Sequence, residues 1–300
     1  MKILGTGLNG LVGSRIVELL NNSCEFENLS LNTGVDITNP NILFKKFKNS
    51  NATIVLHLAG KTDVDSCEKD KEFDARFFKN ESPVGEKTAW SVNVTGTKNI
   101  VDACKKTNKR LIYISTDFVF DGKNCPENGY SEKDIPNPIN WYGKTKYEGE
   151  ALVKNSGLEF LIMRIAYPYR SNFERKDFVR SLIDGFRNNK LLTMIEDHII
   201  TPTFIDDIAY AFDFLVKNNQ TGIFHVTGSQ FLSPLDCAFQ IAETFNFNKS
   251  LIAKTTREEY FKNRALRPFC LSLKNDKISK LGIKMRGFKE GLIELKRQMI

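Results

Sequence analysis

Two residues suited to acid–base chemistry stand four positions apart near the middle of the chain. Tyr142 and Lys146 fall within residues 141–154, a predicted helix for which Asn140 is the expected N-cap. On a helix this spacing brings both side chains to one face, about one turn apart. A phenol has a pKa of about 10, and a nearby ammonium stabilises the phenolate and lowers that value. The pair therefore predicts a tyrosine acid–base activated by a lysine.

Further polar groups are expected where a predicted strand ends. Residues 110–115 form a short apolar run, and Thr116 and Asp117 follow it directly. Open parallel sheets place their chemistry at the carboxyl ends of their strands. We expect Thr116 to orient a carbonyl oxygen and Asp117 to shape the substrate end of the site. Asn93, from the preceding predicted helix, is expected to brace the site and to position a water near Lys146.

A glycine-rich turn follows the first predicted strand, residues 2–5, and opens a predicted helix at residues 11–20. Gly7, Gly10 and Gly13 lie in this turn, where glycines permit a tight bend and a close approach of the backbone. A helix N-terminus favours negative charge, and a pyrophosphate fits there. The turn therefore predicts a dinucleotide cofactor.

The choice between NADH and NADPH stays open. An acidic residue about 20 positions after the turn commonly holds the ribose 2′-hydroxyl, whereas an arginine accepts the 2′-phosphate of NADP. Asp36 comes a few residues late for the first role. Arg15 is interpreted as a solvated helix residue. We therefore predict an NAD(P)H cofactor without deciding the nucleotide.

The elements that position these groups alternate between short apolar runs and amphipathic helices, which is typical of β-α-β units. Strands are expected at residues 2–5, 29–31, 53–58, 110–115, 160–164 and 223–226. Helices are expected at residues 11–20, from Pro40 onward, and at 141–154, 177–188, 206–217 and 234–245. The pattern predicts an α/β fold, a Rossmann-type doubly wound parallel sheet with a smaller, interwoven C-terminal substrate lobe.

We expect two domains and one insertion. Residues 1–165 are predicted to bind NAD(P), and residues 166–300 to form the substrate-binding lobe, interwoven with the first domain. Residues 68–87 are polar and contain Pro83 and Gly85. They are predicted to be a surface insertion that could serve as a lid.

Composition excludes several classes of protein. The chain has 300 residues, of which 41% are hydrophobic and 26% charged, so it is not disordered, collagen-like or coiled-coil. Its net charge of +7 is interleaved along the chain, and no aromatic–basic motif accompanies the basic C-terminal stretch. No nucleic-acid partner is therefore predicted. The N-terminus has only a brief apolar run, so we expect no membrane segment and a cytoplasmic protein.

Cysteines and histidines give no sign of a metal centre. The six cysteines lie far apart without a Cys-x-x-Cys pair, and the chain has only three histidines. Neither a metal site nor a disulfide framework is predicted. His57 and His225 end apolar runs and are interpreted as core residues with satisfied hydrogen bonds, and no role is assigned to His198.

Three motifs together resemble the extended short-chain dehydrogenase/reductases, and among them the dTDP-4-dehydrorhamnose reductase family. They are Gly7-x-x-Gly10-x-x-Gly13, Ser115-Thr116-Asp117-Phe118-Val119-Phe120-Asp121-Gly122 and Tyr142-Gly143-Lys144-Thr145-Lys146. The resemblance implies hydride transfer from reduced nicotinamide to the 4-keto carbon of a nucleotide-linked deoxysugar. It implies that Thr116, Tyr142 and Lys146 are catalytic, with Tyr142 protonating the alkoxide and Lys146 holding the nicotinamide ribose.

The same resemblance implies a set of binding residues. The implied cofactor contacts are Gly7, Asn9, Gly10, Leu11, Val12, Gly13, Asp36, Ile37, Leu58, Ala59, Gly60, Lys61, Asn93, Ser115, Tyr142 and Lys146. The implied substrate contacts are Thr116, Tyr167 and Arg267. Tyr167 stands where the family usually has Trp, and the run after Arg267 lacks the family's Ser. These departures concern the sugar more than the chemistry.

Two alternatives stay open. One is a nucleotide-sugar epimerase or dehydratase of the same superfamily, which would retain its NAD through the cycle. The other is a non-catalytic regulatory subunit like the β subunit of methionine adenosyltransferase, which shares these motifs and binds a dinucleotide while serving a partner. For the reductase, the expected partners are a nucleotide-sugar substrate and a second copy of the chain in a homodimer.

Overall fold

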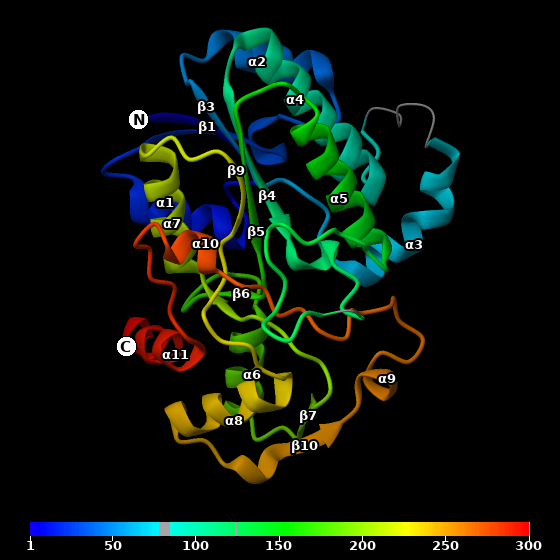
Figure 1. Cartoon of the computed structure of the whole chain (residues 1–300), viewed down its shortest axis with the longest axis vertical. Helices are drawn as coiled ribbons and strands as arrows, with labels where there is room; N and C mark the ends of the chain where they lie inside the picture. The colour runs from blue at the N-terminus through cyan, green and yellow to red at the C-terminus, as the bar shows by residue number, and fades with distance from the viewer. Residues whose placement is uncertain (78–84, 124, 300) are drawn as a thin grey trace. The chain divides into compact units, whose positions relative to one another are not determined.

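In the computed structural model, which describes residues 1–77, 85–123 and 125–299, six strands form one sheet in the order β2-β1-β3-β4-β5-β9 (Figure 1). The strands are β1 (Lys2–Thr6), β2 (Glu25–Leu29), β3 (Ile54–His57), β4 (Arg110–Thr116), β5 (Phe160–Ile165) and β9 (Gly222–His225). β1 pairs in parallel with β2 and β3, and β3 pairs in parallel with β4. The strand order reverses at β1, which is where open α/β sheets bind ligands. The predicted α/β fold with a parallel sheet is confirmed.

The chain divides into two compact units. The first contains Met1–Val119, Pro136–Met163 and Leu215–Ile223. The second contains Phe120–Ile135, Arg164–Phe214 and Phe224–Ile300.

Helices of the first unit pack on the sheet through apolar stripes. They include α1 (Leu11–Leu20), α2 (Pro40–Asn49), α4 (Gly96–Thr107) and α5 (Trp141–Lys154). α4 lies between α2 and α5 against the sheet (Figure 1). Leu43, Ile100 and Val153 from these three helices are fully buried in one core with Leu111 of β4. Burying one apolar side chain of this size stabilises the fold by about 1.5–3 kcal/mol relative to leaving it exposed. This core fixes α5 against β4.

The second predicted strand is displaced toward the N-terminus. The prediction of residues 29–31 is wrong, because β2 ends at Leu29 and Leu31–Thr33 form a short 3-10 helix, η1. Among the described residues, β2 lies at the edge of the sheet, beside β1. Its side chains include Glu25 and Glu27, which pair with Lys2 at 3.3 and 2.7 Å. A charged edge strand does not show the apolar pattern of the buried strands.

Part of the predicted insertion is a helix. Residues 64–74 form α3 (Val64–Asp74), and Ala75–Phe77 continue as a 3-10 helix, η2. Asp63 caps α3 by accepting a hydrogen bond from Ser66 N at 2.7 Å. Only Cys67 and Asp74 of α3 are buried, and most of its other residues are polar. The first part of the predicted insertion, residues 68–74, is therefore helical, and residues 78–84 lie outside the described residues.

The second unit contains two small parallel pairs and several helices. The strand pairs are β6 (Pro168–Tyr169) with β8 (Thr203–Phe204), and β7 (Leu192–Ile195) with β10 (Ile252–Thr255). The helices are α6 (Phe178–Arg187), α8 (Pro234–Phe245), α9 (Arg257–Tyr260), α10 (Asp276–Ser279) and α11 (Phe288–Gln298). α7 (Ile205–Lys217) begins in this unit and ends in the first. The core of the unit gathers Tyr169, Phe186, Phe204, Ile241 and Phe288.

Cys125 and Cys270 form a disulfide, with their Cα atoms 6.0 Å apart. The expectation that the cysteines do not pair is therefore wrong for these two, while the other four are free and buried. The pairing follows from two segments of the second unit that run together. Tyr130 N donates to Ser272 O at 2.7 Å, and Lys274 N donates to Tyr130 O at 2.8 Å. A partner 145 residues away leaves no local signal in the sequence.

No helix among the described residues has the length and apolarity needed to cross a bilayer. The same residues contain no cluster of three or more His, Cys, Asp and Glu side chains arranged to hold a metal ion.

Candidate active site

The glycine turn fits closely against the end of β3. Gly7 has a φ of +70°, and a Cβ there would lie 2.6 Å from Ala59 N. A Cβ on Gly13 would lie 2.5 Å from Gly7 O. Gly10 is the N-cap of α1, no side chain caps this end, and its first turn has no acidic residue. The first N–H groups of α1 and its positive dipole end are thus left for an anion.

Amides and hydroxyls lie around the end of β2. Asn28 donates to Asn9 Oδ1 at 2.8 Å, and Asn9 donates to Ser30 Oγ at 3.3 Å. Asp36 accepts from both the backbone N–H and the hydroxyl of Thr38 at 2.8 Å. The Asp36 carboxylate is therefore held in a local turn.

Asn93 joins the loop after β3 to helix α5. It lies in a short π-helix, η3 (Ser91–Thr95), and is 1% exposed. Its Oδ1 accepts from Lys61 N at 2.8 Å, while its amide donates to Lys61 O and to Thr145 Oγ1 at 3.0 Å each. Asn93 thus braces Gly60 and Lys61 against α5. The predicted water near Lys146 stays a prediction.

The end of β4 carries buried hydroxyl and carboxyl groups. Thr116 donates to Asp117 Oδ1 at 2.8 Å and accepts from Phe118 N at 3.2 Å. Burial raises the pKa of Asp117 to about 7, although the Thr116 hydrogen bond opposes this rise. The hydroxyl of Ser115 and Oδ2 of Asp117 are buried and have no hydrogen-bond partner within the described part of the chain. Buried polar atoms of this kind are expected to meet a ligand or a water.

Tyr142 lies over this strand end, in the first turn of α5. As predicted, Asn140 caps the helix by accepting from Gly143 N at 2.8 Å. The Tyr142 ring meets Phe118 edge-on, with centroids 5.6 Å apart. Burial raises the pKa of the Tyr142 phenol, and a hydrogen bond with the Thr116 side chain opposes the rise. The structure therefore brings Thr116 and Tyr142 together.

Lys146 points elsewhere than expected. Its Nζ donates to Ile114 O at 2.8 Å and lies 4.1 Å from the centroid of the Tyr113 ring. Burial lowers the pKa of Lys146 to about 7, with Glu150 opposing the shift. The expectation that Lys146 lowers the pKa of Tyr142 is not met, because burial dominates and the shift of Tyr142 is upward.

Tyr167 and Arg267 belong to a cluster of side chains in the second unit. Tyr167 has a φ of +39°, a conformation that non-glycine residues rarely adopt. Its hydroxyl lies 3.0 Å from His198 Nε2, and His198 Nδ1 lies 3.2 Å from Phe269 O. Arg267 is 9% exposed, and its guanidinium stacks 5.0 Å from the centroid of Phe261. The position of His198 beside Tyr167 left no signal in the sequence, since the two lie 31 residues apart.

The other two histidines are core residues, as predicted. His57 contacts the hydroxyls of Thr6 at 2.7 Å and Thr97 at 3.1 Å, and His225 lies 3.1 Å from Lys274 O. Burial lowers the pKa of each histidine to about 3. Both rings are therefore neutral at physiological pH.

Known proteins resemble the chain over two thirds or more of its length. It is 29% identical over 247 residues to dTDP-4-dehydrorhamnose reductase of Aggregatibacter actinomycetemcomitans, covering 80% of this chain and 78% of the relative. It is 33% identical over 217 residues to methionine adenosyltransferase 2 subunit beta of Bos taurus, covering 68% and 63%.

Solved structures agree. The Bacillus anthracis dTDP-4-dehydrorhamnose reductase in complex with NADP superposes with a TM-score of 0.86 at 26% identity, covering 99% of both chains. The Clostridium acetobutylicum dTDP-4-dehydrorhamnose reductase gives 0.86 at 30% identity, covering 100% of this chain and 99% of the other. A sequence model described as the RmlD substrate binding domain matches residues 1–299. The chain therefore belongs to the RmlD substrate-binding-domain family, the family of the dTDP-4-dehydrorhamnose reductases.

Proposed function

We propose that this protein is an NAD(P)H-dependent oxidoreductase that reduces the 4-keto group of a nucleotide-linked deoxysugar, as its dTDP-4-dehydrorhamnose reductase relatives are named to do. The observation that carries the proposal is that Thr116 and Tyr142 are both buried against Phe118 at the carboxyl end of β4, since Phe118 N donates to Thr116 Oγ1 at 3.2 Å and the Phe118 ring meets that of Tyr142. The retained-NAD alternative is not favoured, because the UDP-glucose 4-epimerase of Thermus thermophilus is only 20% identical and shares the fold alone.

The residues present fit a dinucleotide. The uncapped N-terminus of α1 suits a pyrophosphate, and the glycines leave the turn without Cβ atoms. The buried Ser115 hydroxyl has no hydrogen-bond partner among the described residues and can bind the cofactor. When bound, NAD(P)H supplies the hydride. We propose that the cofactor contacts are Gly7, Asn9, Gly10, Leu11, Val12, Gly13, Asp36, Ile37, Leu58, Ala59, Gly60, Lys61, Asn93, Ser115, Tyr142 and Lys146.

In the proposed reaction, Thr116 and Tyr142 donate hydrogen bonds to the keto oxygen and so polarise the carbonyl. Because burial raises its pKa, Tyr142 keeps its proton until the carbonyl oxygen gains negative charge. Tyr142 then transfers that proton to the oxygen while C4 accepts the hydride, and a hydroxyl results. Lys146 stands one helical turn away on α5, and we propose that it holds the nicotinamide ribose.

The substrate side is proposed to lie in the C-terminal lobe. Tyr167 and Arg267 are proposed to contact the sugar and the diphosphate, respectively, since a buried arginine suits phosphate oxygens. We propose that residues 1–165 form a cofactor domain and residues 166–300 a substrate lobe, interwoven because residues 120–135 belong to the second compact unit and residues 215–223 to the first. A homodimer and a cytoplasmic location, where soluble nicotinamide cofactors are available, complete the proposal.

The test is a loss of reduced-nicotinamide absorbance when the purified protein meets NADPH or NADH and a dTDP-4-keto-6-deoxysugar. We expect oxidation by the wild type and a rate lower by about 10²–10⁴ in Tyr142→Phe, with cofactor binding nearly unchanged. No oxidation of either cofactor would exclude this substrate class. Stable co-purification with a methionine adenosyltransferase catalytic subunit, without turnover, would point to the regulatory alternative.

A further inference from the structure

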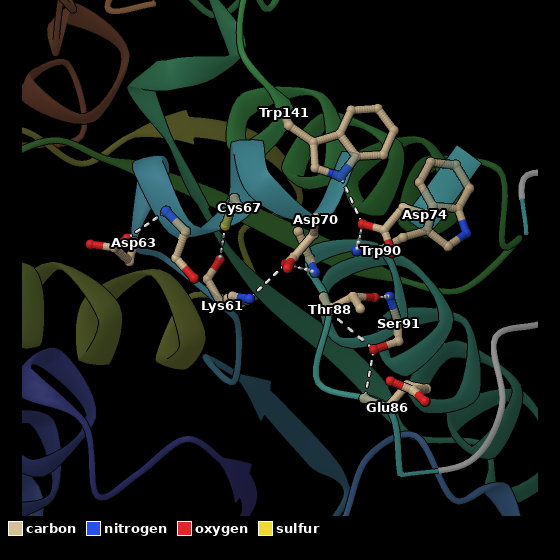
Figure 2. A network of polar contacts seen from close by, with 12 residues as sticks. Lys61, Asp63, Cys67, Asp70, Asp74, Glu86, Thr88, Trp90, Ser91 and Trp141 are labelled. Carbon is tan, nitrogen blue, oxygen red and sulfur yellow. Dashed lines mark hydrogen bonds and ion pairs between the residues drawn. The ribbon is translucent and has the colours of Figure 1, made fainter. Parts of the chain in front are cut away.

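Asp74, the last residue of α3, holds the residue that precedes Tyr142. The Asp74 side chain is 0% exposed, and its Oδ2 accepts from Trp141 Nε1 at 2.8 Å and from Trp90 N at 3.0 Å. Figure 2 shows the Asp74 carboxylate between the two indole-bearing residues. A hydrogen bond to a buried carboxylate is about twice as strong as one between neutral groups. One carboxylate thus ties the end of α3 to the start of α5.

A second carboxylate of α3 holds the same residue through its backbone. Glu68 Oε2 accepts from Trp141 N at 2.8 Å. Trp141 is the first residue of α5, and its N–H is one of the four at a helix start that have no partner within the helix. Both N–H groups of Trp141 are therefore bound to carboxylates of α3, and the residue is fixed at two points.

The ring of Trp141 is also fixed by packing. It is stacked on Trp90, with centroids 5.8 Å apart and planes inclined by 17°. Trp90 directly precedes η3, which carries Asn93. Successive residues of a helix are related by a rotation of about 100°, so fixing Trp141 also fixes the direction in which Tyr142 leaves the helix.

We infer that Asp74 is a positioning residue for the proposed reduction, because through the indole of Trp141 it sets where the Tyr142 hydroxyl points. The inference rests on the proposed role of Tyr142. Asp74 has no part in the proton transfer itself. A displacement of about 1 Å in a reacting group can lower a rate about 10²-fold. We therefore expect the loss of the Asp74 carboxylate to lower turnover by less than about 10²-fold and to leave cofactor and sugar binding unchanged.

The test compares Asp74→Asn with Trp141→Phe, which removes the Nε1 donor but keeps an aromatic ring. We expect each to lower kcat about tenfold, with KM for cofactor and sugar changed less than about twofold. Because both remove one interaction, the double variant should lose little beyond either single one. Losses that multiply in the double variant, or an unchanged kcat in both, would overturn the inference.

Asp177→Asn is the matched control. Asp177, like Asp74, is a buried side chain that bonds the first turn of a helix, since it caps α6 by accepting from Arg180 N at 2.9 Å and pairs with Arg180 Nε at 2.7 Å. It lies in the second unit. We expect Asp177→Asn to lower the melting temperature but to leave kcat within about twofold. A kcat loss equal to that of Asp74→Asn would show that the effect is general destabilisation.

Hydrogen exchange separates this inference from the proposed function. If the wild type reduces no keto-sugar, the proposed function fails, but the exchange rate of the Trp141–Lys154 amides still reports how α5 begins. Asp74→Asn should speed exchange in the first turn of α5, and Asp177→Asn should not. Equal exchange in the wild type and Asp74→Asn would overturn the inference regardless of activity.

Discussion

The hydroxyl of Thr116 donates a hydrogen bond of 2.8 Å to Oδ1 of Asp117, and the two side chains are 5% and 2% exposed. A threonine hydroxyl has a single proton, so while it donates to Asp117 it does not donate to a substrate carbonyl. Protonated Asp117 is itself a donor and leaves the Thr116 proton free to turn. Because burial raises the pKa of Asp117 to about 7, this exchange of donors occurs near neutral pH.

We expect the reductase rate to fall as pH rises through about 7. Ionisation of Asp117 draws the Thr116 proton away from the carbonyl. Lys146, whose pKa is also about 7, loses its charge over the same range, which weakens its proposed hydrogen bond to the nicotinamide ribose. The measurement is kcat/KM against pH for the wild type and Asp117→Asn. The amide mimics the protonated carboxyl, so the variant should keep only the shallower fall due to Lys146. A wild-type profile that is flat across neutral pH would contradict this account.

Asp117→Asn should also stabilise the fold above neutral pH. The folded pKa of about 7 lies above the unfolded value of about 3.9. The wild type therefore loses stability as pH rises from about 3.9 to about 7, and the loss is complete above the folded pKa. Asparagine does not titrate and escapes this loss. Urea unfolding at acid and alkaline pH measures the difference, which should be absent below about pH 4 and largest above 7. A difference independent of pH would exclude this cause.

Asn93→Ala should destabilise the first unit. The substitution removes three hydrogen bonds, two to the backbone of Lys61 and one to Thr145, at a site that is 1% exposed. Leaving buried partners unsatisfied costs about 1–3 kcal/mol for each group, so we expect a total loss of about 3 kcal/mol after relaxation. Urea unfolding gives the number. Lys98→Ala is the control, since the pair of Lys98 with Asp102 at 3.2 Å is exposed and its loss should cost less than about 1 kcal/mol.

The sequence predicts α5 well because its signals are local. Asn140 caps the helix and Tyr142 and Lys146 share its face, so cap and spacing identify the element and its chemistry together. The bond from Trp141 to Asp74 joins residues 67 positions apart in an otherwise polar helix, and such a contact has no periodic signature. Cys125 and Cys270 are separated still further.

Other misses have electrostatic causes. The edge strand β2 lacks the apolar pattern that predicts buried strands, because its glutamates pair with Lys2 and need no burial. The direction of the Tyr142 pKa depends on how deeply the phenol is buried, which spacing along a helix does not reveal.

The corrected end of β2 leads to a prediction about the cofactor. With the strand ending at Leu29, the residue that follows is Ser30, whose Oγ accepts a hydrogen bond from Asn9 at 3.3 Å. A carboxylate there would bind the ribose 2′-hydroxyl of NADH and repel the 2′-phosphate of NADPH. Neither Ser30 nor Asn9 carries a carboxylate. We therefore expect kcat/KM to favour NADPH by about tenfold, which corresponds to about 1.4 kcal/mol. Ser30→Asp should reverse the preference, because the introduced charge repels the phosphate. Steady-state kinetics with both cofactors decide the matter. Ser30→Ala is the control and should leave the preference for NADPH in place, whereas an equal preference in Ser30→Asp and the wild type would place the selecting group elsewhere.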